Sequence, residues 1–214
     1  MQELLNDWKT NRIGVFTASN VHKLLISNRS GKGFGKTALD YINEVVAELL
    51  TGKSENETYS KAIEWGCATE ADAMAAYIDK TKKSVEYFGK ENPVFFKIED
   101  LPAGASPDGL IKDERIVEAK CPYNSANHIE NMSLTAESFK TERKEYYAQI
   151  QLCMYATGVK LADFVSFDPR ILSDENKLFI LEIPYNEEFV NNLLERIKEA
   201  SELLKSIYKS ITHK

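Results

Sequence analysis

Residues 106–120 read Ser-Pro-Asp-Gly-Leu-Ile-Lys-Asp-Glu-Arg-Ile-Val-Glu-Ala-Lys, and this stretch decides the fold. The polar residues 112–115 separate two apolar runs, a pattern that predicts a β-hairpin. Side chains alternate between the two faces of a strand, so Glu118 and Lys120 are expected on one face and their neighbours on the other. Folding of the hairpin then returns Asp108 to the neighbourhood of Glu118 and Lys120.

These three side chains suit metal-dependent phosphoryl chemistry. Two carboxylates are hard oxygen ligands for Mg²⁺, and a nearby ammonium can stabilise phosphate charge or activate a water. The apolar residues around Glu118 and Lys120 predict that both are buried, where unpaired charges are unfavourable. A metal ion with a phosphate would account for these buried charges, and so would a structural ion pair. The pattern alone leaves both interpretations open.

The composition indicates an ordinary globular protein. The chain has 214 residues, of which 43% are hydrophobic and 28% charged, enough for one domain with a sizeable buried core. It contains no apolar run long enough to cross a membrane, and its start lacks the features of a secretory signal. Three scattered cysteines predict neither a disulfide framework nor a four-cysteine metal site. A reducing, cytoplasmic location is therefore expected.

The charge is distributed unevenly along the chain. The net charge is −6, yet residues 8–39 contain no Asp or Glu and carry six Lys or Arg residues. A polyanion such as DNA would be attracted to this stretch and repelled by much of the remaining chain. A solvated basic surface without function is the alternative.

The pattern of apolar residues predicts a mixed α/β domain. Helices are expected over about 18–26, 38–50, 60–82, within 134–157, and in a C-terminal helix over about 187–212. Strands are expected over 85–88, 93–98, 162–167 and 178–183, besides the hairpin. The glycine-rich, basic residues 27–36 predict an irregular loop and do not match a nucleotide-binding Walker A loop. No linker or repeat divides the chain, so residues 1–214 are expected to form a single domain with a central sheet.

A second candidate site lies near the N-terminus. Free N–H groups and a hydroxyl at the start of the predicted helix 18–26 would attract a phosphate, and Arg12 would add a bidentate donor. Ser19 would supply the hydroxyl. Alternatively, Thr17 and Ser19 only cap the helix and Arg12 forms a surface salt bridge. The pattern does not decide between these interpretations.

Seven short motifs together resemble the phage lambda exonuclease family, the YqaJ-like viral recombinases within the PD-(D/E)xK nuclease superfamily. They span residues 8–170, about three quarters of the chain, and their joint order is far more specific than any one of them. The motifs are Trp8-x-x-x-Arg12-x-Gly14-x-x-Thr17-Ala18-Ser19, Ala47-Glu48 with Thr51-Gly52, Trp65-Gly66 with Glu70, Ser106-Pro107-Asp108-Gly109-Leu110, Glu118-Ala119-Lys120-Cys121-Pro122, Tyr147-Ala148-Gln149-x-Gln151, and Asp168-Pro169-Arg170.

This resemblance implies both a fold and an activity. The implied fold is a restriction-endonuclease-like core, a central mixed β-sheet flanked by helices. The implied activity is that of a Mg²⁺-dependent 5′→3′ exonuclease that processively digests one strand of linear double-stranded DNA. It further implies two Mg²⁺ per active site, with Mn²⁺ able to substitute, a homotrimeric ring, and a single-strand annealing protein as partner in phage-type recombination. A phage or prophage gene product acting in the cytoplasm of a bacterial host is expected, with no membrane partner.

The resemblance also implies a role for each matching position. The metal ligands would be Asp108, Glu118 and the backbone carbonyl of Ala119. The groups that orient or activate the attacking water, or support the site, would be Lys120, Glu70 and Gln149. The terminal 5′ phosphate would be held by Arg12, Ser19 and Thr17.

Two other functions use the same residues differently. One is a structure-specific or restriction-type endonuclease on the same core, which would cut circular DNA. The other is a non-catalytic adaptor that binds DNA ends. The presence of Asp108, Glu118 and Lys120 argues against the adaptor, because a protein without catalysis has no need to bury these charges.

Overall fold

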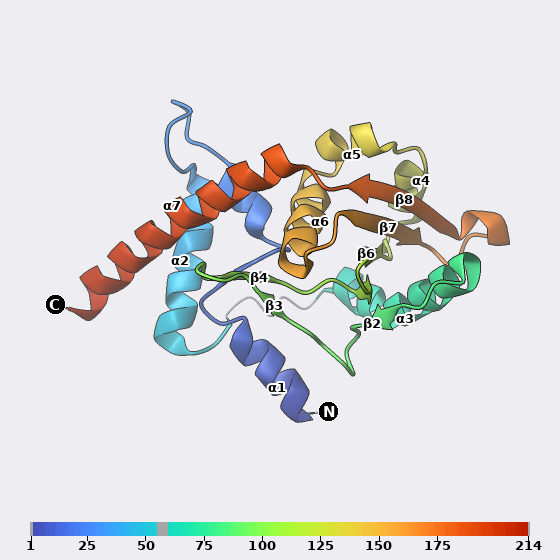
Figure 1. Cartoon of the computed structure of the whole chain (residues 1–214), viewed down its shortest axis with the longest axis horizontal. Coiled ribbons are helices and arrows are strands. Elements are labelled where there is room, and N and C mark those ends of the chain that lie inside the picture. Colours follow the sequence, from blue (N-terminus) through green and yellow to red (C-terminus); the bar gives the residue numbers. More distant parts are fainter. Residues whose placement is uncertain (1, 55–59, 214) are drawn as a thin grey trace.

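The structure, a computed structural model, describes residues 2–54 and 60–213 and contains two β-sheets surrounded by helices (Figure 1). The larger sheet has five strands in the order β2-β5-β6-β7-β8. Its strands are β2 (Glu86–Tyr87), β5 (Gly109–Ile111), β6 (Arg115–Lys120), β7 (Leu161–Phe167) and β8 (Leu178–Pro184). The smaller sheet contains β1 (Phe16–Thr17), β4 (Ala103–Ala105) and β3 (Phe96–Lys97). Helices cover both faces of the larger sheet, which confirms the expected α/β architecture.

Most helices follow the sequence predictions, and the differences lie near the N-terminus and directly after the hairpin. The described α-helices are α1 (Gln2–Asn11), α2 (Lys36–Thr51), α3 (Lys61–Thr81), α4 (Ser125–Met132), α5 (Ala136–Glu142), α6 (Lys144–Thr157) and α7 (Glu187–Thr212). The helices predicted over 38–50, 60–82 and 187–212 are confirmed. Gly52 and Gly158 end α2 and α6 in the left-handed conformation that glycine adopts without strain. The helices α1 and α4 were not predicted.

The predicted hairpin of residues 106–120 is confirmed. β5 and β6 are antiparallel, with Gly109 opposite Val117, and Asp113 takes the left-handed conformation in the turn. β6 then runs parallel to β7, and the chain between them forms α4, α5 and α6. The sheet therefore contains both antiparallel and parallel pairs, as expected. The parallel pair requires the long crossover through α4, α5 and α6, whereas the hairpin is closed by a short turn.

Two hydrophobic clusters bury β6 on both faces. Ile116 lies in the cluster that includes α6 and α7, whereas Val117 lies in the cluster formed with α3. This alternation matches the period of a strand, and each large side chain buried in this way stabilises the fold by roughly 1.5–3 kcal/mol. In Figure 1, α6 lies between the sheet and the layer formed by α2 and α7. The sheet end that carries Lys120 is thus enclosed by α3 and α6.

Two N-terminal predictions need correction. The prediction of a helix over 18–26 is wrong, since only a five-residue 3₁₀ helix, η1 (Val21–Leu25), forms there. The loop 27–36 is less irregular than expected, because Ser27 and Phe34 form a β-bridge across it. The Asn28 side chain accepts hydrogen bonds from the backbone N–H groups of Ser30 and Lys32, and this closes a compact turn.

None of the helices within residues 2–54 and 60–213 is long and apolar enough to cross a lipid bilayer.

Candidate active site

The C-terminal residues of β6 place Glu118 and Lys120 on one face, as their spacing predicts. The Lys120 ammonium donates to Glu118 Oε1 at 2.6 Å, and Gln149 Nε2 on α6 donates to the same oxygen at 2.5 Å. The Glu118 side chain is only 1% exposed, and that of Lys120 is 23% exposed. The structure therefore brings three of the predicted site residues into direct contact.

Asp108 reaches the same site from the residue before β5. Its Oδ2 accepts a hydrogen bond from the backbone N–H of Ala119 at 2.7 Å. The N–H and C=O groups of one residue in a strand point to the same strand edge, so the carbonyl of Ala119 also faces Asp108. Both predicted carboxylates and the predicted backbone carbonyl thus lie around the end of one hairpin.

Glu70 approaches this end of the sheet from α3. Its Oε1 accepts a hydrogen bond from the Tyr87 hydroxyl at 3.0 Å. Glu70, Ala119 and Lys120 line one pocket with a cavity volume of about 800 Å³. The helix therefore presents Glu70 across an open space from Lys120.

Carboxylates outnumber cations at this end of the sheet. Burial raises the pKa of Asp108, and burial followed by the Asp108 charge raises the pKa of both Glu118 and Glu70. Burial alone would lower the pKa of Lys120, but the Glu118 and Asp108 carboxylates raise it above the usual value. The Lys120 ammonium therefore stays protonated, and its single positive charge faces the three carboxyl groups of Glu118, Asp108 and Glu70.

These donors fit a divalent cation. Glu118 Oε2 is buried and has no hydrogen-bond partner, so one hard oxygen remains available in a region rich in negative charge. No cluster of three or more His, Cys, Asp or Glu side chains with metal-site spacing occurs in the described part of the chain. The candidate ligand set accordingly has only two side chains, Asp108 and Glu118, together with the Ala119 carbonyl, and Glu70 lines the same pocket.

Tyr146 belongs to the site but was not predicted. Its ring centroid lies 5.0 Å from the Lys120 ammonium, and the ring stacks on Phe164 with the two centroids 6.0 Å apart. A cation over an aromatic face is held electrostatically, so Tyr146 restricts Lys120. The available signal was its spacing, because Tyr146 precedes Gln149 by three residues and shares its helix face.

Arg12 lies in a second pocket, beside the hairpin. Its guanidinium is 4.3 Å from the Trp8 ring, and its Nη1 donates to Ser106 Oγ at 3.4 Å. The Trp8 indole N–H donates to the same hydroxyl at 3.1 Å. Ser106 was not predicted as a site residue, although it opens the stretch that contains Asp108 and precedes it by two residues.

Thr17 and Ser19 are close to each other but differ in their surroundings. Their hydroxyls are 3.3 Å apart, and Thr17 lines the Arg12 pocket, which has a cavity volume of about 540 Å³. Thr17 is buried in β1, where its backbone N–H donates to the Tyr41 hydroxyl, whereas Ser19 is exposed. Neither hydroxyl caps η1. The argument for a phosphate on a helix start therefore fails, and Arg12 with the hydroxyls remains.

Acidic groups also line the Arg12 pocket. Glu44 and Glu48 are among its lining residues, and Glu48 Oε2 accepts a hydrogen bond from the Gly14 N–H at 3.1 Å. Burial lowers the pKa of Arg12, although Tyr41 and Glu48 oppose this shift. The pocket therefore combines the Arg12 guanidinium, Lys9 and Lys53 with the carboxylates Glu44 and Glu48.

Residues 7–160 match the family model described as the YqaJ-like viral recombinase domain. The chain belongs to the YqaJ-like viral recombinase family. No curated protein matches its sequence. The family assignment agrees with the resemblance inferred from the motifs.

Solved structures share the fold of this YqaJ-like recombinase. An alkaline exonuclease, LHK-Exo from Laribacter hongkongensis, is 27% identical with a TM-score of 0.81, and the match covers 97% of this chain and 96% of that chain. The same values hold for LHK-Exo in complex with dAMP. A phage related exonuclease from Haemophilus somnus 129PT is 17% identical with a TM-score of 0.72, over 92% of this chain and 96% of that chain, and shows the common fold alone.

Proposed function

We propose that this YqaJ-like recombinase is a divalent-metal-dependent exonuclease that digests one strand of linear double-stranded DNA from its 5′ end. The observation that carries the proposal is the convergence of Asp108, Glu118 and Lys120 at one end of β6, with a buried Glu118 oxygen left unpartnered. The similarity to an alkaline exonuclease, and to its complex with dAMP, supports it.

The proposed cofactor is Mg²⁺, held by Asp108, Glu118 and the carbonyl of Ala119. Two ions are proposed per site, with Mn²⁺ able to substitute. When bound, the metal would supply charge neutralisation at the scissile phosphate and a more acidic water. Hard carboxylate and carbonyl oxygens are the donors that these ions prefer.

The protein side chains have separate roles in the proposed reaction. The raised pKa of Lys120 keeps its ammonium protonated. This ammonium would stabilise the negative charge that develops on the phosphate. Gln149 holds Glu118 Oε1 and would thereby leave Oε2 available to a metal ion. Glu70, with a raised pKa, is suited to accept a proton from the attacking water.

The proposed 5′ polarity rests on Arg12. Its guanidinium contacts Ser106, which is two residues from Asp108 along the same segment, so a terminal phosphate at Arg12 would lie beside the cleavage site. Arginine binds phosphate through two parallel N–H groups, which also fixes orientation. Thr17 and Ser19 would add hydroxyl donors from β1 and the residues that follow it.

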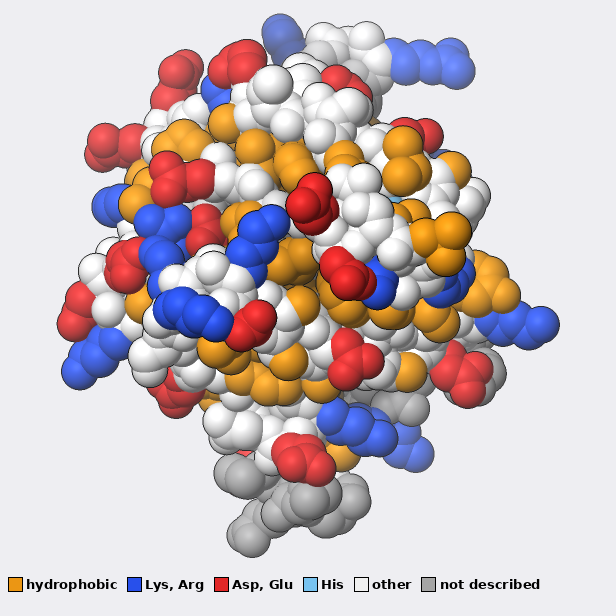
Figure 2. All heavy atoms as spheres, turned by 90° about the vertical axis from the view of Figure 1, so that its right-hand side faces the viewer, with side chains coloured by type: hydrophobic (Ala, Val, Ile, Leu, Met, Phe, Trp, Pro, Cys, Tyr) orange, Lys and Arg blue, Asp and Glu red, His pale blue; other side chains and the backbone are white. Residues whose placement is uncertain are grey.

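A ring of copies would explain how an acidic chain binds DNA. Figure 2 shows one face of the molecule, where Lys and Arg side chains alternate with Asp and Glu and form no continuous basic band among the residues drawn in colour. Several copies of the basic stretch 8–39 around one channel would concentrate positive potential there. We therefore propose a homotrimer that digests DNA processively, and light scattering that returns a monomer would contradict the ring.

The proposed biological setting follows from the family. A single-strand annealing protein would receive the single strand that digestion leaves behind, in phage-type recombination within the cytoplasm of a bacterial host. Co-purification of such a partner with the recombinase during infection would support this setting.

One digestion experiment separates the proposed function from its alternatives. Linear and circular duplexes are incubated with the protein in Mg²⁺ or in chelator. We expect loss of linear DNA only, and only in Mg²⁺. Cleavage of the circle would indicate an endonuclease, and a shifted but intact linear band would indicate a DNA-end-binding adaptor.

Replacement of Arg12 by Ala tests the polarity. We expect digestion of 5′-phosphorylated ends to slow by about 10-fold or more, since an Arg–phosphate pair is a charge-assisted bidentate contact. Digestion of 5′-hydroxyl ends, which lack the phosphate, is the control and should change much less. An equal effect on both ends would remove Arg12 from the phosphate pocket.

A further inference from the structure

The loop between β7 and β8 carries a charge pair that the proposed chemistry does not use. The Asp168 side chain is fully buried, and Arg170 grips it with Nε at 2.8 Å from Oδ1 and Nη2 at 2.9 Å from Oδ2. Burial would raise the pKa of Asp168, but hydrogen bonds from Arg170 and Ser125 lower it to about 2. A two-point contact of this kind fixes the plane of the guanidinium.

The fixed guanidinium is directed at the chain that follows Lys120. Its Nη1 donates to the Tyr123 carbonyl at 2.9 Å, and its Nη2 donates to the Pro122 carbonyl at 3.0 Å. Residues 119–124 form one wall of the 800 Å³ pocket beside the candidate active site. Arg170 therefore holds this wall from behind, two to three residues after Lys120.

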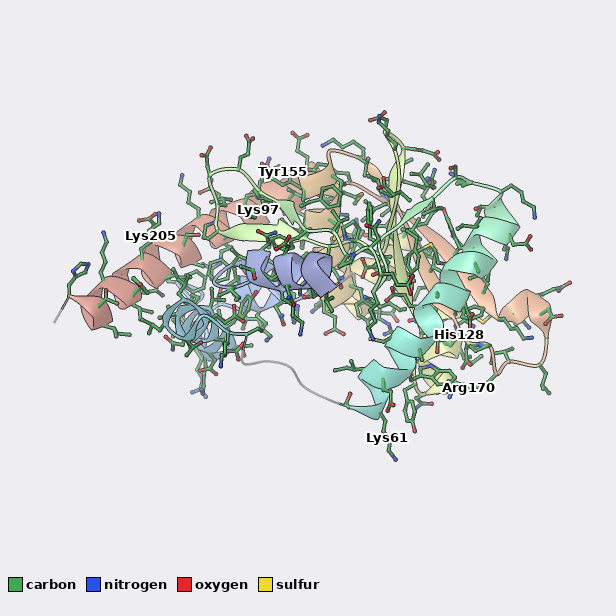
Figure 3. All side chains as sticks on the ribbon, turned by 90° about the horizontal axis from the view of Figure 1, so that it is seen from below. Lys61, Lys97, His128, Tyr155, Arg170 and Lys205 are labelled. Carbon is green, nitrogen blue, oxygen red and sulfur yellow. The ribbon has the colours of Figure 1, made fainter. Side chains whose placement is uncertain are left out.

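The same guanidinium also contacts α3, the helix whose residues, Glu70 among them, form another wall of the pocket. It lies 4.3 Å from the ring of Trp65 on α3, and Figure 3 shows Arg170 beside the first turns of that helix. Trp65 is five residues before Glu70, the α3 carboxylate that faces Lys120 across the pocket. Neither Arg170 nor Trp65 lines the pocket, yet their contact joins the two segments that carry its walls, residues 119–124 and α3.

We propose that Arg170 is a positioning residue that fixes the separation of the two walls and so places Glu70 relative to Lys120. This inference rests on the proposed nuclease function. The neighbouring Leu172 is 99% exposed, so packing of this part of the loop against the core does not explain the buried Asp168–Arg170 pair. Every described contact of Arg170 leads to its own ion pair or to one of the two walls.

Replacement of Arg170 by Lys keeps the charge and removes both the fork and the planar stack. We expect kcat on linear duplex to fall by about 10-fold or more, because small displacements of reacting groups have large effects on rate. KM should change by less than about twofold, since DNA binding depends mainly on phosphate contacts elsewhere.

Arg115 provides the matched control. It also pairs with a buried aspartate, Asp163, but at the other end of β6 and away from both walls. Arg115→Lys should keep kcat within about twofold of wild type once the folded fraction is equalised. An equal loss of kcat in both variants, or no loss in Arg170→Lys, would contradict the positioning role of Arg170 and leave the proposed nuclease function standing. Absence of nuclease activity in the wild type would instead overturn the proposed function, and the inference with it.

Trp65 gives a second test that leaves the Asp168–Arg170 pair intact. Trp65→Phe keeps an aromatic face for the guanidinium and should retain most of kcat, whereas Trp65→Leu removes the face and should lower kcat as Arg170→Lys does. In a Trp8→Phe background, where Trp65 is the sole tryptophan, Arg170→Lys should also increase acrylamide quenching of its fluorescence. Equal kcat for the Phe and Leu variants, or unchanged quenching, would contradict the bridging contact.

Discussion

The two ends of β6 bury charges in opposite ways. At the first end, Arg115 Nη1 donates to Asp163 at 2.7 Å and to Glu182 at 2.9 Å, and the Tyr77 hydroxyl donates to Asp163 at 2.5 Å. At the other end, the Glu118 carboxylate has one oxygen bound by Lys120 and one oxygen buried without a partner. Both ends belong to the same strand, and α3 contributes a side chain at each, Tyr77 at the first and Glu70 at the other.

This difference distinguishes the structural charges at the Arg115 end of β6 from the candidate functional charges at the Lys120 end. Buried charges as such do not indicate a site, because the Arg115 end satisfies them completely within the protein. The Lys120 end has an excess of carboxyl groups. Burial raises the pKa of all three, and the Asp108 charge raises the pKa of Glu118 and Glu70 further. An unsatisfied excess of one charge is typical of a site that binds a ligand of opposite charge.

The largest expected contrast is in activity. Lys120→Met and Asp108→Asn should each reduce DNA digestion by at least about 10³-fold, because they remove transition-state stabilisation or a metal ligand. Arg115→Lys should digest at nearly the wild-type rate. Rates on a 5′-phosphorylated linear duplex measure this, and gel shifts should show that the inactive variants still bind DNA. Full activity in either site variant would exclude that residue from the site.

The contrast in stability should run the other way. Arg115→Met leaves the buried Asp163 carboxylate without its cation, with the Tyr77 hydrogen bond still in place, and should destabilise the protein by about 3–5 kcal/mol. Glu118→Gln removes a carboxylate that is already unfavourable in the metal-free protein, and should change stability by less than about 1 kcal/mol. Urea unfolding in chelator compares the two. If Glu118→Gln proved the more destabilising, the view that its charge is unsatisfied would be wrong.

A smaller effect links pH to metal binding. The pKa of Glu118 is raised by burial and by Asp108 to about 8, so the folded protein binds more protons than the unfolded chain between ordinary carboxylate pKa values and about pH 8. Stability without metal should therefore fall as pH rises through this range. Mg²⁺ competes with these protons, so it should raise Tm by a few degrees more at pH 8 than at pH 6. An equal rise at both values, or none, would argue against metal binding by these carboxylates.

Sequence reasoning succeeded where local periodicity decides the structure. The alternation of a strand was sufficient to place Glu118 and Lys120 on one face, and the polar turn before them was sufficient to return Asp108 to their side. Gly52 and Gly158 marked helix ends for a similar reason, since few other residues adopt the left-handed conformation there.

Sequence reasoning failed where distant segments decide the structure. The apolar spacing of 18–26 resembled a helix, but pairing of β1 with β4 extends the chain at Thr17 and leaves only a short 3₁₀ turn. The contact of Arg12 with Ser106 joins residues 94 positions apart, which no local pattern reveals. Tyr146 touches Lys120 only because α6 packs on β6, a tertiary contact that its own sequence neighbourhood does not specify.

Titration with Mn²⁺ at pH 8, followed by electron paramagnetic resonance, tests most directly whether the excess carboxylates hold a metal. The compared proteins are the wild type, the double variant Asp108→Asn/Glu118→Gln, and the control Glu114→Gln/Glu182→Gln at the Arg115 end. We expect the control to bind Mn²⁺ like the wild type and the site variant to bind at least about 10–100-fold more weakly. Unchanged binding by the site variant, or binding lost in the control, would contradict the assignment of the metal site to the Lys120 end of β6.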